Sequence, residues 1–343
     1  MGATIKQIAE IAGVSTGTVD RAIHGRGRVN PEVSQRILDI CKALNYKPNK
    51  AGRHFSPQKQ QIKLGFICSV ERITGVWASI NQGIQEASQE LREYNITVET
   101  RQFPLYLPEV ELALIDELIE EGVKGLVIAP LNSPIIANRI NELISQGFPI
   151  VFVNSEVDGC SPLAYVGSNY LAAGRTAAGL FNLLRPKDPL NLIVFYGTTF
   201  MMSQHQRVEG LSNELDRCNR SYKLIGPFAI TADPELAYTT SQEILCRESD
   251  ANAIFTVGGC VSSVCQAILD TNLTQKVVHI SYDISPTIKS FLSNGSLSVA
   301  IGQEGVRQGY QSPKILADYL LFHIKPDSSR IFTHSEIYID QNS

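Results

Sequence analysis

Apolar residues recur at helical spacing in the N-terminal part of the chain and predict three short helices. Thr4, Ser15 and Asn30 are placed to cap the amino-terminal ends of these helices. Gly13 should end the first helix, and Pro31 takes the first position of the third, where its missing N–H costs nothing. The predicted buried faces are Ile5, Ile8, Ala9 and Ala12, then Val19, Ala22 and Ile23, then Val33, Ile37, Ile40 and Leu44.

The arrangement of these helices predicts a DNA-binding motif. Two helices joined by a tight turn that contains glycine, with a third helix packed across them, form a helix-turn-helix. Its second helix enters the major groove with its N-terminal residues at the base edges. Thr16, Gly17 and Arg21 stand at that end, and arginine is the most frequent specific reader of guanine. Ser15 and Thr18 suit phosphate contacts.

Asp20 stands directly beside Arg21 in this basic stretch, where a carboxylate would repel phosphate. Three roles remain open for it. It orients a neighbouring arginine through a charge-assisted hydrogen bond, accepts a hydrogen bond from N4 of cytosine, or is a solvated acid favoured by the helix dipole.

From residue 62 onward, short apolar runs alternate with helical patterns, which indicates parallel strands joined by right-handed crossovers. Ile80, Ile84, Ala87 and Leu91 mark the buried face of the first helix in this region. We expect two doubly wound α/β units, one before and one after a helix that begins near Asn169. The strands are predicted at 62–69, 96–103, 124–130, 149–154, 190–197, 223–230, 251–258, 277–283 and 297–303.

Charge is distributed unevenly along the chain. Residues 1–59 contain ten Lys or Arg and four Asp or Glu, a net charge of +6, whereas the whole chain carries −4. This asymmetry favours an N-terminal module that faces a polyanion, attached to a body that does not. A charged segment that only improves solubility is the alternative.

Several functional classes lack their sequence signals. No apolar run reaches the length of a membrane helix, and the N-terminus has no signal-peptide core, so we expect a cytoplasmic protein. The seven cysteines form no CxxC pair, and Cys260 and Cys265 have no histidine cluster beside them, so we expect no metal site. No nucleotide-binding glycine motif and no nucleophile elbow occur, so we expect neither enzymatic activity nor a cofactor.

Polar side chains stand where the predicted strands end. In open α/β sheets, ligands bind beyond the carboxyl ends of the strands. Carboxylate, amide and guanidinium groups exchange hydrogen bonds with hydroxyls, and an aromatic ring stacks on C–H faces, so the set suits a neutral polyhydroxylated ligand. The candidate residues are Glu71, Trp77, Asn132, Asn154, Arg207, Asp283 and Gln303.

Most of these residues also have a purely structural interpretation. The alternatives are a core anchor for Trp77, a helix cap before Pro286 for Asp283, a turn for Asn154, a surface pair with Glu209 for Arg207, and a solvated loop for Gln303.

The N-terminal segment resembles the DNA-binding headpiece of the lactose-repressor (LacI/GalR) family. The shared pattern is T-I-x-x-I-A-x-x-A-G-V-S-x-x-T-V-x-R, then V-x-x-x-x-x-x-R-I, then L-x-Y-x-P-N. The resemblance places Thr16, Gly17 and Arg21 on base-reading positions. It also implies that residues 48–55 form a hinge helix that enters the minor groove, with Phe55 as the apolar wedge and Gly52 weakening the helix. The expected DNA-binding set is Thr4, Ser15, Thr16, Gly17, Thr18, Asp20, Arg21, Arg28, Asn49, Gly52 and Phe55.

The body resembles the periplasmic sugar-binding-protein fold, closest to its ribose-binding type. The matching pieces are "YVGSNYLAAGRTAA", "RVEG", "SYDISP" and "AIGQE" followed by "QGY". This resemblance implies that Asn154, Arg207, Asp283 and Gln303 contact a sugar. Gly258 and Gly259 stand where the ribose type has Asn and Asp, which favours a cyclitol, a sugar phosphate or an amino sugar over ribose.

The combined expectation is a sequence-specific transcriptional regulator, a repressor controlled by a sugar-like effector. It would act as a homodimer or higher oligomer on palindromic operator DNA at the nucleoid, with the helix at 76–92 as a candidate dimer face. A solute-capturing transporter protein and an α/β enzyme are the alternatives; the first predicts a signal peptide and the second a phosphate loop or catalytic pair. We expect a helix-turn-helix headpiece at 1–47, a hinge and linker at 48–60, and an effector-binding domain of two α/β subdomains at 61–343.

Overall fold

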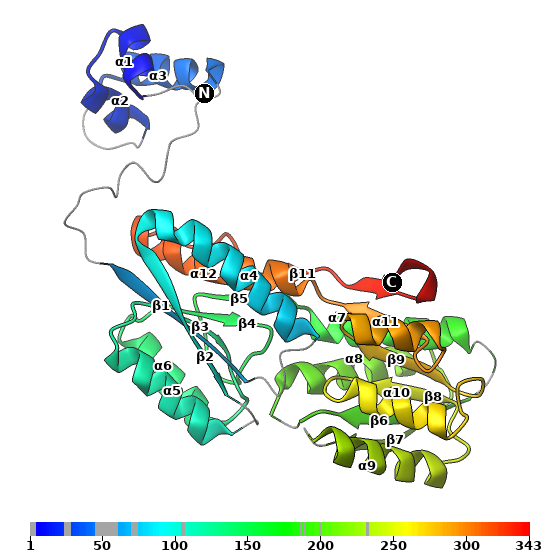
Figure 1. Cartoon of the computed structure of the whole chain (residues 1–343). Coiled ribbons are helices and arrows are strands. Elements are labelled where there is room, and N and C mark those ends of the chain that lie inside the picture. The colour runs from blue at the N-terminus through cyan, green and yellow to red at the C-terminus, as the bar shows by residue number, and fades with distance from the viewer. Residues whose placement is uncertain are drawn as a thin grey trace. The chain divides into compact units, whose positions relative to one another are not determined.

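The computed structural model describes residues 5–23, 29–44, 61–69, 75–103, 107–185, 187, 189–198, 200–230 and 233–343. The chain forms two compact units, residues 1–59 and residues 60–343. Each has its own apolar core. The described residues of the first unit form three helices, and the second unit combines helices with two sheets (Figure 1).

The first unit contains α1 (Ile5–Ala12), α2 (Thr16–Ile23) and α3 (Pro31–Ala43). Its core confirms most of the predicted faces, since Ile8, Val19 and Ile37 are completely buried. Leu44 is 38% exposed, so its predicted burial is wrong. The reason is that α3 ends at Ala43, and Leu44 as the C-cap residue leaves the buried face of the helix.

The local structure confirms the predicted helix boundaries at Gly13, Ser15 and Asn30, whereas the predicted cap Thr4 lies outside the described residues. Gly13 adopts the left-handed conformation, with φ of 65°, after α1. The Ser15 hydroxyl accepts a hydrogen bond from the Thr18 N–H at 3.2 Å, and the Asn30 side chain accepts one from the Glu32 N–H at 2.9 Å. These side chains satisfy N–H groups that the first turn of a helix leaves without partners.

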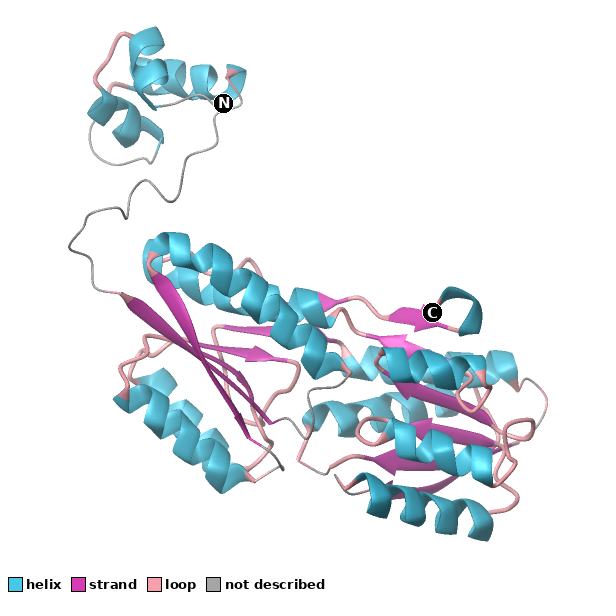
Figure 2. Ribbon diagram, viewed as in Figure 1, coloured by secondary structure: helices cyan, strands magenta, loops and turns pink. Residues whose placement is uncertain are grey.

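The second unit contains two six-stranded sheets, shown in magenta in Figure 2. The first has the order β11-β5-β4-β3-β1-β2 and is parallel throughout; the second has the order β12-β10-β9-β8-β6-β7, with β12 antiparallel to β10. The first sheet comprises β1 (Ile62–Ser69), β2 (Ile96–Phe103), β3 (Leu126–Ala129), β4 (Ile150–Val153), β5 (Ala164–Ser168) and β11 (Arg330–Thr333). The second comprises β6 (Leu190–Tyr196), β7 (Tyr222–Ala229), β8 (Ala253–Thr256), β9 (Val278–Tyr282), β10 (Val299–Gly302) and β12 (Glu336–Tyr338).

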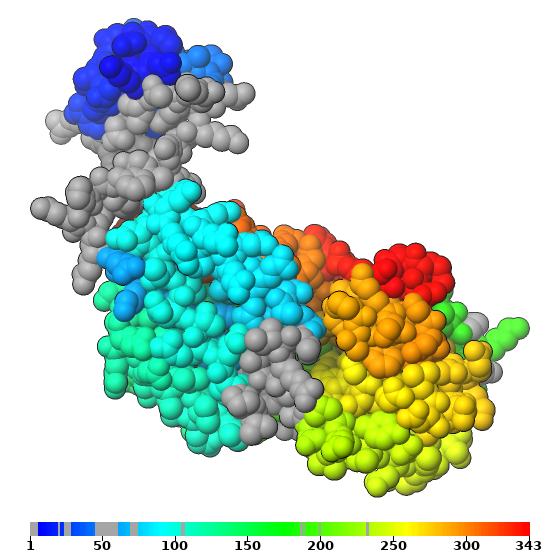
Figure 3. Space-filling model, viewed as in Figure 1, coloured from blue at the N-terminus to red at the C-terminus, as the bar shows by residue number. Residues whose placement is uncertain are grey.

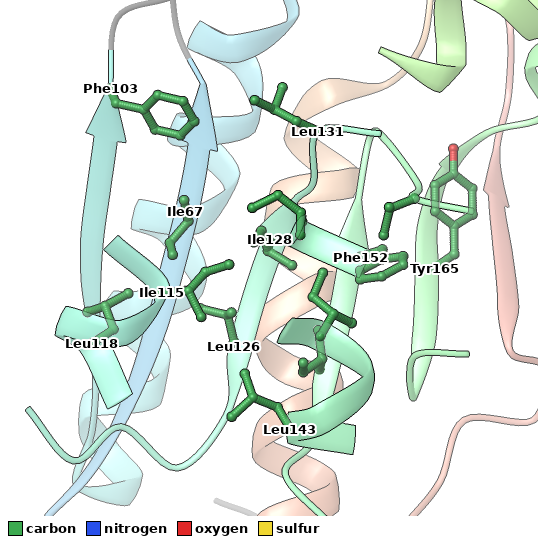
Figure 4. Packing of buried hydrophobic residues seen from close by; sticks show 14 of the residues in the cluster. Ile67, Phe103, Ile115, Leu118, Leu126, Ile128, Leu131, Leu143, Phe152 and Tyr165 are labelled. Carbon is green, nitrogen blue, oxygen red and sulfur yellow. The ribbon is translucent and has the colours of Figure 1, made fainter. Parts of the chain in front are cut away.

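Helices cover both faces of each sheet and define two lobes. The first lobe adds α4 (Val76–Leu91), a 3₁₀ turn (Arg92–Tyr94), α5 (Pro108–Glu120), α6 (Pro134–Ser145) and α12 (Gly305–Phe322). The second adds α7 (Tyr170–Leu184), α8 (Met202–Arg217), α9 (Pro234–Arg247), α10 (Val261–Asp270) and α11 (Pro286–Ser293), and a 3₁₀ turn (Asp340–Asn342) ends the chain. Figure 4 shows one layer of the first lobe, where Ile115, Leu118 and Leu143 pack on Leu126 and Ile128.

The predicted strands are confirmed, but the predicted division of the chain is wrong in one respect. The sequence suggested one α/β unit before the helix near Asn169 and one after it. In the structure, α12 packs on α4, and β11 pairs with β5, so the chain returns to the first lobe after β10. It therefore crosses between the lobes at three places, after β5, after β10 and after β11.

Glycines allow close helix contacts in both lobes. A Cβ on Gly83 of α4 would lie 2.0 Å from the carbonyl oxygen of Val306 of α12. A Cβ on Gly174 of α7 would lie 2.1 Å from the carbonyl oxygen of Arg207 of α8. Each lobe thus contains a helix pair whose backbones touch.

None of the described helices is long and apolar enough to cross a membrane. The described His, Cys, Asp and Glu residues contain no group arranged to hold a metal ion, and the cysteines at 260 and 265 are free thiols.

Candidate functional site

The amino-terminal edge of α2 is the first candidate site. Thr16, Gly17 and Arg21 are exposed on it, while Val19 and Ala22 of the same helix are buried in the core of the first unit. Arg21 lies along this edge, because its Nε donates a hydrogen bond to the Gly17 carbonyl oxygen at 3.1 Å. The exposed edge therefore presents hydroxyl and guanidinium groups, as a major-groove reading helix does.

Gly17 leaves open space on this edge. A Cβ at this position would meet only the Ser15 hydroxyl oxygen, at 3.9 Å. Glycine is therefore not required by packing here. The predicted DNA contacts Thr4, Arg28, Asn49, Gly52 and Phe55, and the side chain of Asp20, lie outside the described residues.

The second candidate site joins strand ends of both lobes. Asn154 follows β4 and Asp283 follows β9, both in the left-handed conformation, with φ of 63° and 70°. Gln303 follows β10 and lies between them. Its Oε1 accepts a hydrogen bond from Asn154 Nδ2 at 3.5 Å, and its Nε2 donates one to Asp283 Oδ1 at 2.5 Å. Asn154 and Gln303 are only 4% and 5% exposed, so these polar groups form a buried chain.

Arg207 of α8 belongs to the same buried cluster. Its guanidinium carbon lies 3.6 Å from the ring centre of Tyr282 and 4.8 Å from that of Tyr170. Its Nη1 donates a hydrogen bond to the Val257 carbonyl oxygen at 2.6 Å. However, Arg207 Nε and the Tyr282 hydroxyl are buried and have no hydrogen-bond partner among the residues that the structure describes. Buried unpaired polar groups are costly, so these two atoms are candidates for hydrogen bonds to a bound molecule.

Opposing effects act on the pKa of the Asp283 carboxyl group. Burial raises the pKa of its carboxyl group, whereas the positive charge of Arg207 and hydrogen bonds from Gln303 and the Val76 N–H lower it. The bond from Val76, at the first turn of α4, connects Asp283 of the second lobe with the first lobe.

Gln308, which the sequence analysis did not single out, links this cluster to the crossovers. Its side chain is completely buried; its Oε1 accepts a hydrogen bond from Asn154 Nδ2 at 3.3 Å, and its Nε2 donates one to the Gln303 carbonyl oxygen at 2.6 Å. Tyr170 was missed as well, and its hydroxyl donates to the Asn154 carbonyl oxygen. Tyr170, Tyr282 and Gln308 stand inside the sequence motifs that carried the resemblance. Their presence in these motifs, close to the ends of predicted strands, could have identified them from the sequence.

Several structural alternatives are now decided. Ser285, not Asp283, caps α11, since the Ser285 hydroxyl accepts a hydrogen bond from the Ile288 N–H at 3.2 Å. The surface pair proposed for Arg207 is wrong, because Arg207 is 4% exposed, and Gln303 is not a solvated loop residue. Asn154 does occupy a turn conformation, in addition to its place in the cluster.

Asn132 and Trp77 contact other parts of the first lobe. Asn132 is bonded to Asp158, with its Nδ2 donating to Oδ2 and its Oδ1 accepting from the N–H, both at 3.1 Å. Trp77 is half-buried and packs against the apolar clusters of the first lobe, as expected for a core anchor. Glu71 lies outside the described residues. The structure therefore brings together Asn154, Arg207, Asp283 and Gln303.

A cavity of about 570 Å³ adjoins Asp283 and Gln303, between α4, α12 and β12. Its size lies in the range of small-molecule sites. Ser79, Tyr310 and Tyr338 form other parts of its wall, whereas Asn154 and Arg207 do not line it.

Comparison with known protein families shows where the chain belongs. Residues 4–49 match the model of the bacterial regulatory proteins of the lacI family, and residues 64–323 match that of the periplasmic binding protein domain. The chain belongs to the periplasmic binding protein domain family over most of its length and carries a lacI-family domain at residues 4–49. Its second unit is a periplasmic binding protein domain, so the fold predicted from the sequence is confirmed.

Two curated proteins illustrate what this chain is similar to. Catabolite control protein A of Staphylococcus epidermidis is 25% identical over 218 residues, which cover 63% of this chain and 62% of that protein. The match thus spans less than two thirds of the relative's length. The probable HTH-type transcriptional repressor ExuR of Bacillus subtilis is 24% identical over 259 residues, covering 74% of this chain and 72% of the relative.

Solved structures support the fold of the second unit. The glucose-galactose binding protein GanP of Geobacillus stearothermophilus superposes with a TM-score of 0.74 at 18% identity, covering 83% of this chain and 99% of that one. A putative LacI transcriptional regulator from Bacteroides fragilis gives a TM-score of 0.72 at 20% identity, covering 82% and 98%.

Proposed function

We propose that this lacI-family chain is a sequence-specific transcriptional repressor whose second unit binds a sugar, a cyclitol or a derivative of one. A single observation carries the proposal: one chain combines an exposed helix edge at Thr16–Arg21 with a buried polar cluster around Arg207. The names of the relatives agree with both parts, since ExuR is a probable repressor and GanP binds glucose and galactose.

The chemistry of the cluster favours a neutral polyhydroxylated effector. Asp283 accepts hydrogen bonds, Arg207 donates them, and the amides of Asn154 and Gln303 do both. Two positions in the loop after β8 offer no side chain, because Gly258 and Gly259 stand there. A Cβ on Gly258 would lie 3.0 Å from Gln204 Nε2, so Gln204 fills this space. This arrangement supports an effector other than ribose.

Effector control would act through the relation of the two lobes. Asn154 belongs to the first lobe, Arg207 and Asp283 belong to the second, and Gln303 stands at a crossover. An effector that bonds to Asn154 and Asp283 competes with Gln303 for both side chains. Effector binding shifts operator affinity only if its affinity differs between the two lobe arrangements.

The remaining parts of the proposal follow from the family. The headpiece covers residues 1–47, the hinge and linker 48–60, and the effector-binding domain 61–343. The protein acts in the cytoplasm at the nucleoid, without enzymatic activity or a cofactor. It reads a palindromic operator as a homodimer, since a two-fold symmetric site requires paired headpieces.

The DNA-binding part is tested by Arg21→Ala. Loss of the guanidinium should cost about 1–3 kcal/mol of operator binding and relax base preference at one position. Selection from a randomised operator library measures both effects. Lys42→Ala, on α3, is a control that should keep the base preference. Unchanged base preference in the Arg21 variant would rule out its reading role.

The effector part is tested by a thermal-shift screen of sugars and cyclitols on the full chain. A ligand that binds the folded state at 100 times its Kd should add about 2.7 kcal/mol of stability. Emission from Trp77, the only tryptophan, should report binding because it stands in the first turns of α4, next to Val76. If no sugar or cyclitol raises the melting temperature of a chain that binds DNA, the proposed effector class is wrong.

A further inference from the structure

The two lobes also meet at a second place, which adjoins the proposed effector cluster at Tyr170. Phe200 and Met201 lie between β6 and α8 of the second lobe. The Phe200 carbonyl oxygen accepts a hydrogen bond from the backbone N–H of Asn132, in the first lobe, at 2.8 Å. Met201 is 5% exposed and belongs to the apolar cluster of the first lobe that includes Leu131 and Val157. A segment of the second lobe is thus packed into the first.

The receiving loop of the first lobe is held on both sides. The Leu131 N–H donates a hydrogen bond to Oε2 of the completely buried Glu111 at 3.1 Å. The Asn132 side chain makes two hydrogen bonds to Asp158. Figure 4 shows Leu131 at the end of the apolar layer formed by Ile67 and Ile128. These hydrogen bonds therefore hold the loop in the conformation that contacts Met201.

The donating segment is equally well held within the second lobe. The Phe200 N–H donates a hydrogen bond to the Thr198 hydroxyl at 3.2 Å. Gln204 Oε1 accepts hydrogen bonds from the Gly197 N–H at 2.9 Å and the Thr198 N–H at 3.2 Å. Met201 is the N-cap residue of α8, the helix that carries Arg207. Movement of Met201 away from the first lobe therefore moves Arg207 with it.

We propose that Phe200 and Met201 form a clasp that keeps the two lobes closed, with Met201 as its anchor. Met201 is then a positioning residue for Arg207, and Asn132 receives the clasp instead of binding the effector. Figure 3 shows the surface of the first lobe, in cyan, meeting that of the second, in orange. The consequence for effector entry rests on the proposed function; the clasp itself does not.

The clasp is tested by lobe distances in the effector-free, full-length chain. Fluorophores are attached through non-natural ketone-bearing residues at 138 on α6 and 243 on α9, which leaves the native cysteines unchanged. Both positions are exposed, and Figure 1 shows these helices on opposite sides of the lobe junction. Single-molecule energy transfer then measures the ratio of closed to open molecules.

Met201→Ala should lower the closed-to-open ratio about 10- to 100-fold. Burial of a methionine side chain in the closed state changes the equilibrium constant between closed and open molecules by about this factor. Met202→Ala is the matched control, since Met202 is half-buried and is not part of the apolar cluster. Met201→Leu keeps the apolar contact and should retain the closed state. Equal ratios in the wild-type chain and the Met201→Ala variant would overturn the proposal, as would a mostly open wild-type chain.

A second measurement distinguishes a failure of the clasp proposal from a failure of the proposed function. The Met201→Ala variant should bind a sugar or cyclitol found in the thermal-shift screen with a higher association rate constant than the wild-type chain. The reason is that the ligand can enter without prior opening of the clasp. If the screen finds no ligand but the distances change as expected, the effector class is wrong and the clasp stands. If a ligand binds and the distances of the variants are equal, the clasp is wrong.

Discussion

Replacement of Asp283 with asparagine should lower effector affinity about 10- to 100-fold and leave operator affinity unchanged. A hydrogen bond to a charged group contributes roughly 1.5–3 kcal/mol, which corresponds to that change in affinity. Asparagine tolerates the φ of 70° at this position and keeps the oxygen that accepts a hydrogen bond from Gln303. The substitution therefore removes the charge beside Arg207 and little else.

The measurement is a titration with a sugar or cyclitol bound by the wild-type chain, followed by operator binding with and without it. Glu209→Gln is the matched control, because Glu209 is an exposed carboxylate on the same helix as Arg207. This variant should respond to the effector like the wild-type chain. Loss of operator binding together with effector binding in Asp283→Asn would instead mean that Asp283 maintains the fold.

Replacement of Gly174 with alanine should destabilise the second unit by roughly 2–4 kcal/mol, the range of a severe overpacking substitution. The new Cβ would lie 2.1 Å from the Arg207 carbonyl oxygen and 2.8 Å from the Leu211 nitrogen. Both are backbone atoms that no rotamer change can move, so α8 must shift away from α7. Because Arg207 moves with α8, effector affinity should fall as well.

Gly179 provides the control on the same helix. No atom lies within 4 Å of a Cβ at this position. Gly179→Ala should therefore raise stability by up to about 1 kcal/mol, since alanine has the higher helix propensity. Urea denaturation followed by circular dichroism measures both variants. Similar free energies of unfolding for the two variants would contradict the close helix contact.

The hydrophobic pattern predicted the longer elements accurately. The strands at 62–69 and 96–103 have the predicted bounds, and the buried face of α4 contains all the predicted residues together with Gly83. The strands β5, β11 and β12 were missed. β11 has four residues, and it pairs with β5, which lies far away in the sequence. A strand this short gives no periodic signal, so its location depends on the partner.

The candidate site, too, was predicted only in part from the sequence. The rule that ligands bind beyond strand ends selected Asn154, Asp283 and Gln303, and the structure joins them through hydrogen bonds. The same rule selected Asn132, whose amide is bonded to Asp158. Position at a strand end does not reveal where a side chain points, because that depends on the neighbouring loop.

By itself, the sequence determined the features that arise within a few residues: the headpiece helices and their caps, the alternation of strands and helices, and the exposed edge from Thr16 to Arg21. These follow from hydrogen bonds and side-chain spacing inside one segment. Only the tertiary structure decided the return of β11 to the first lobe, the stacking of Arg207 on Tyr282 and the packing of Met201 into the first lobe. Periodicity shows that a face is buried, but the partner that buries it comes from a distant part of the chain.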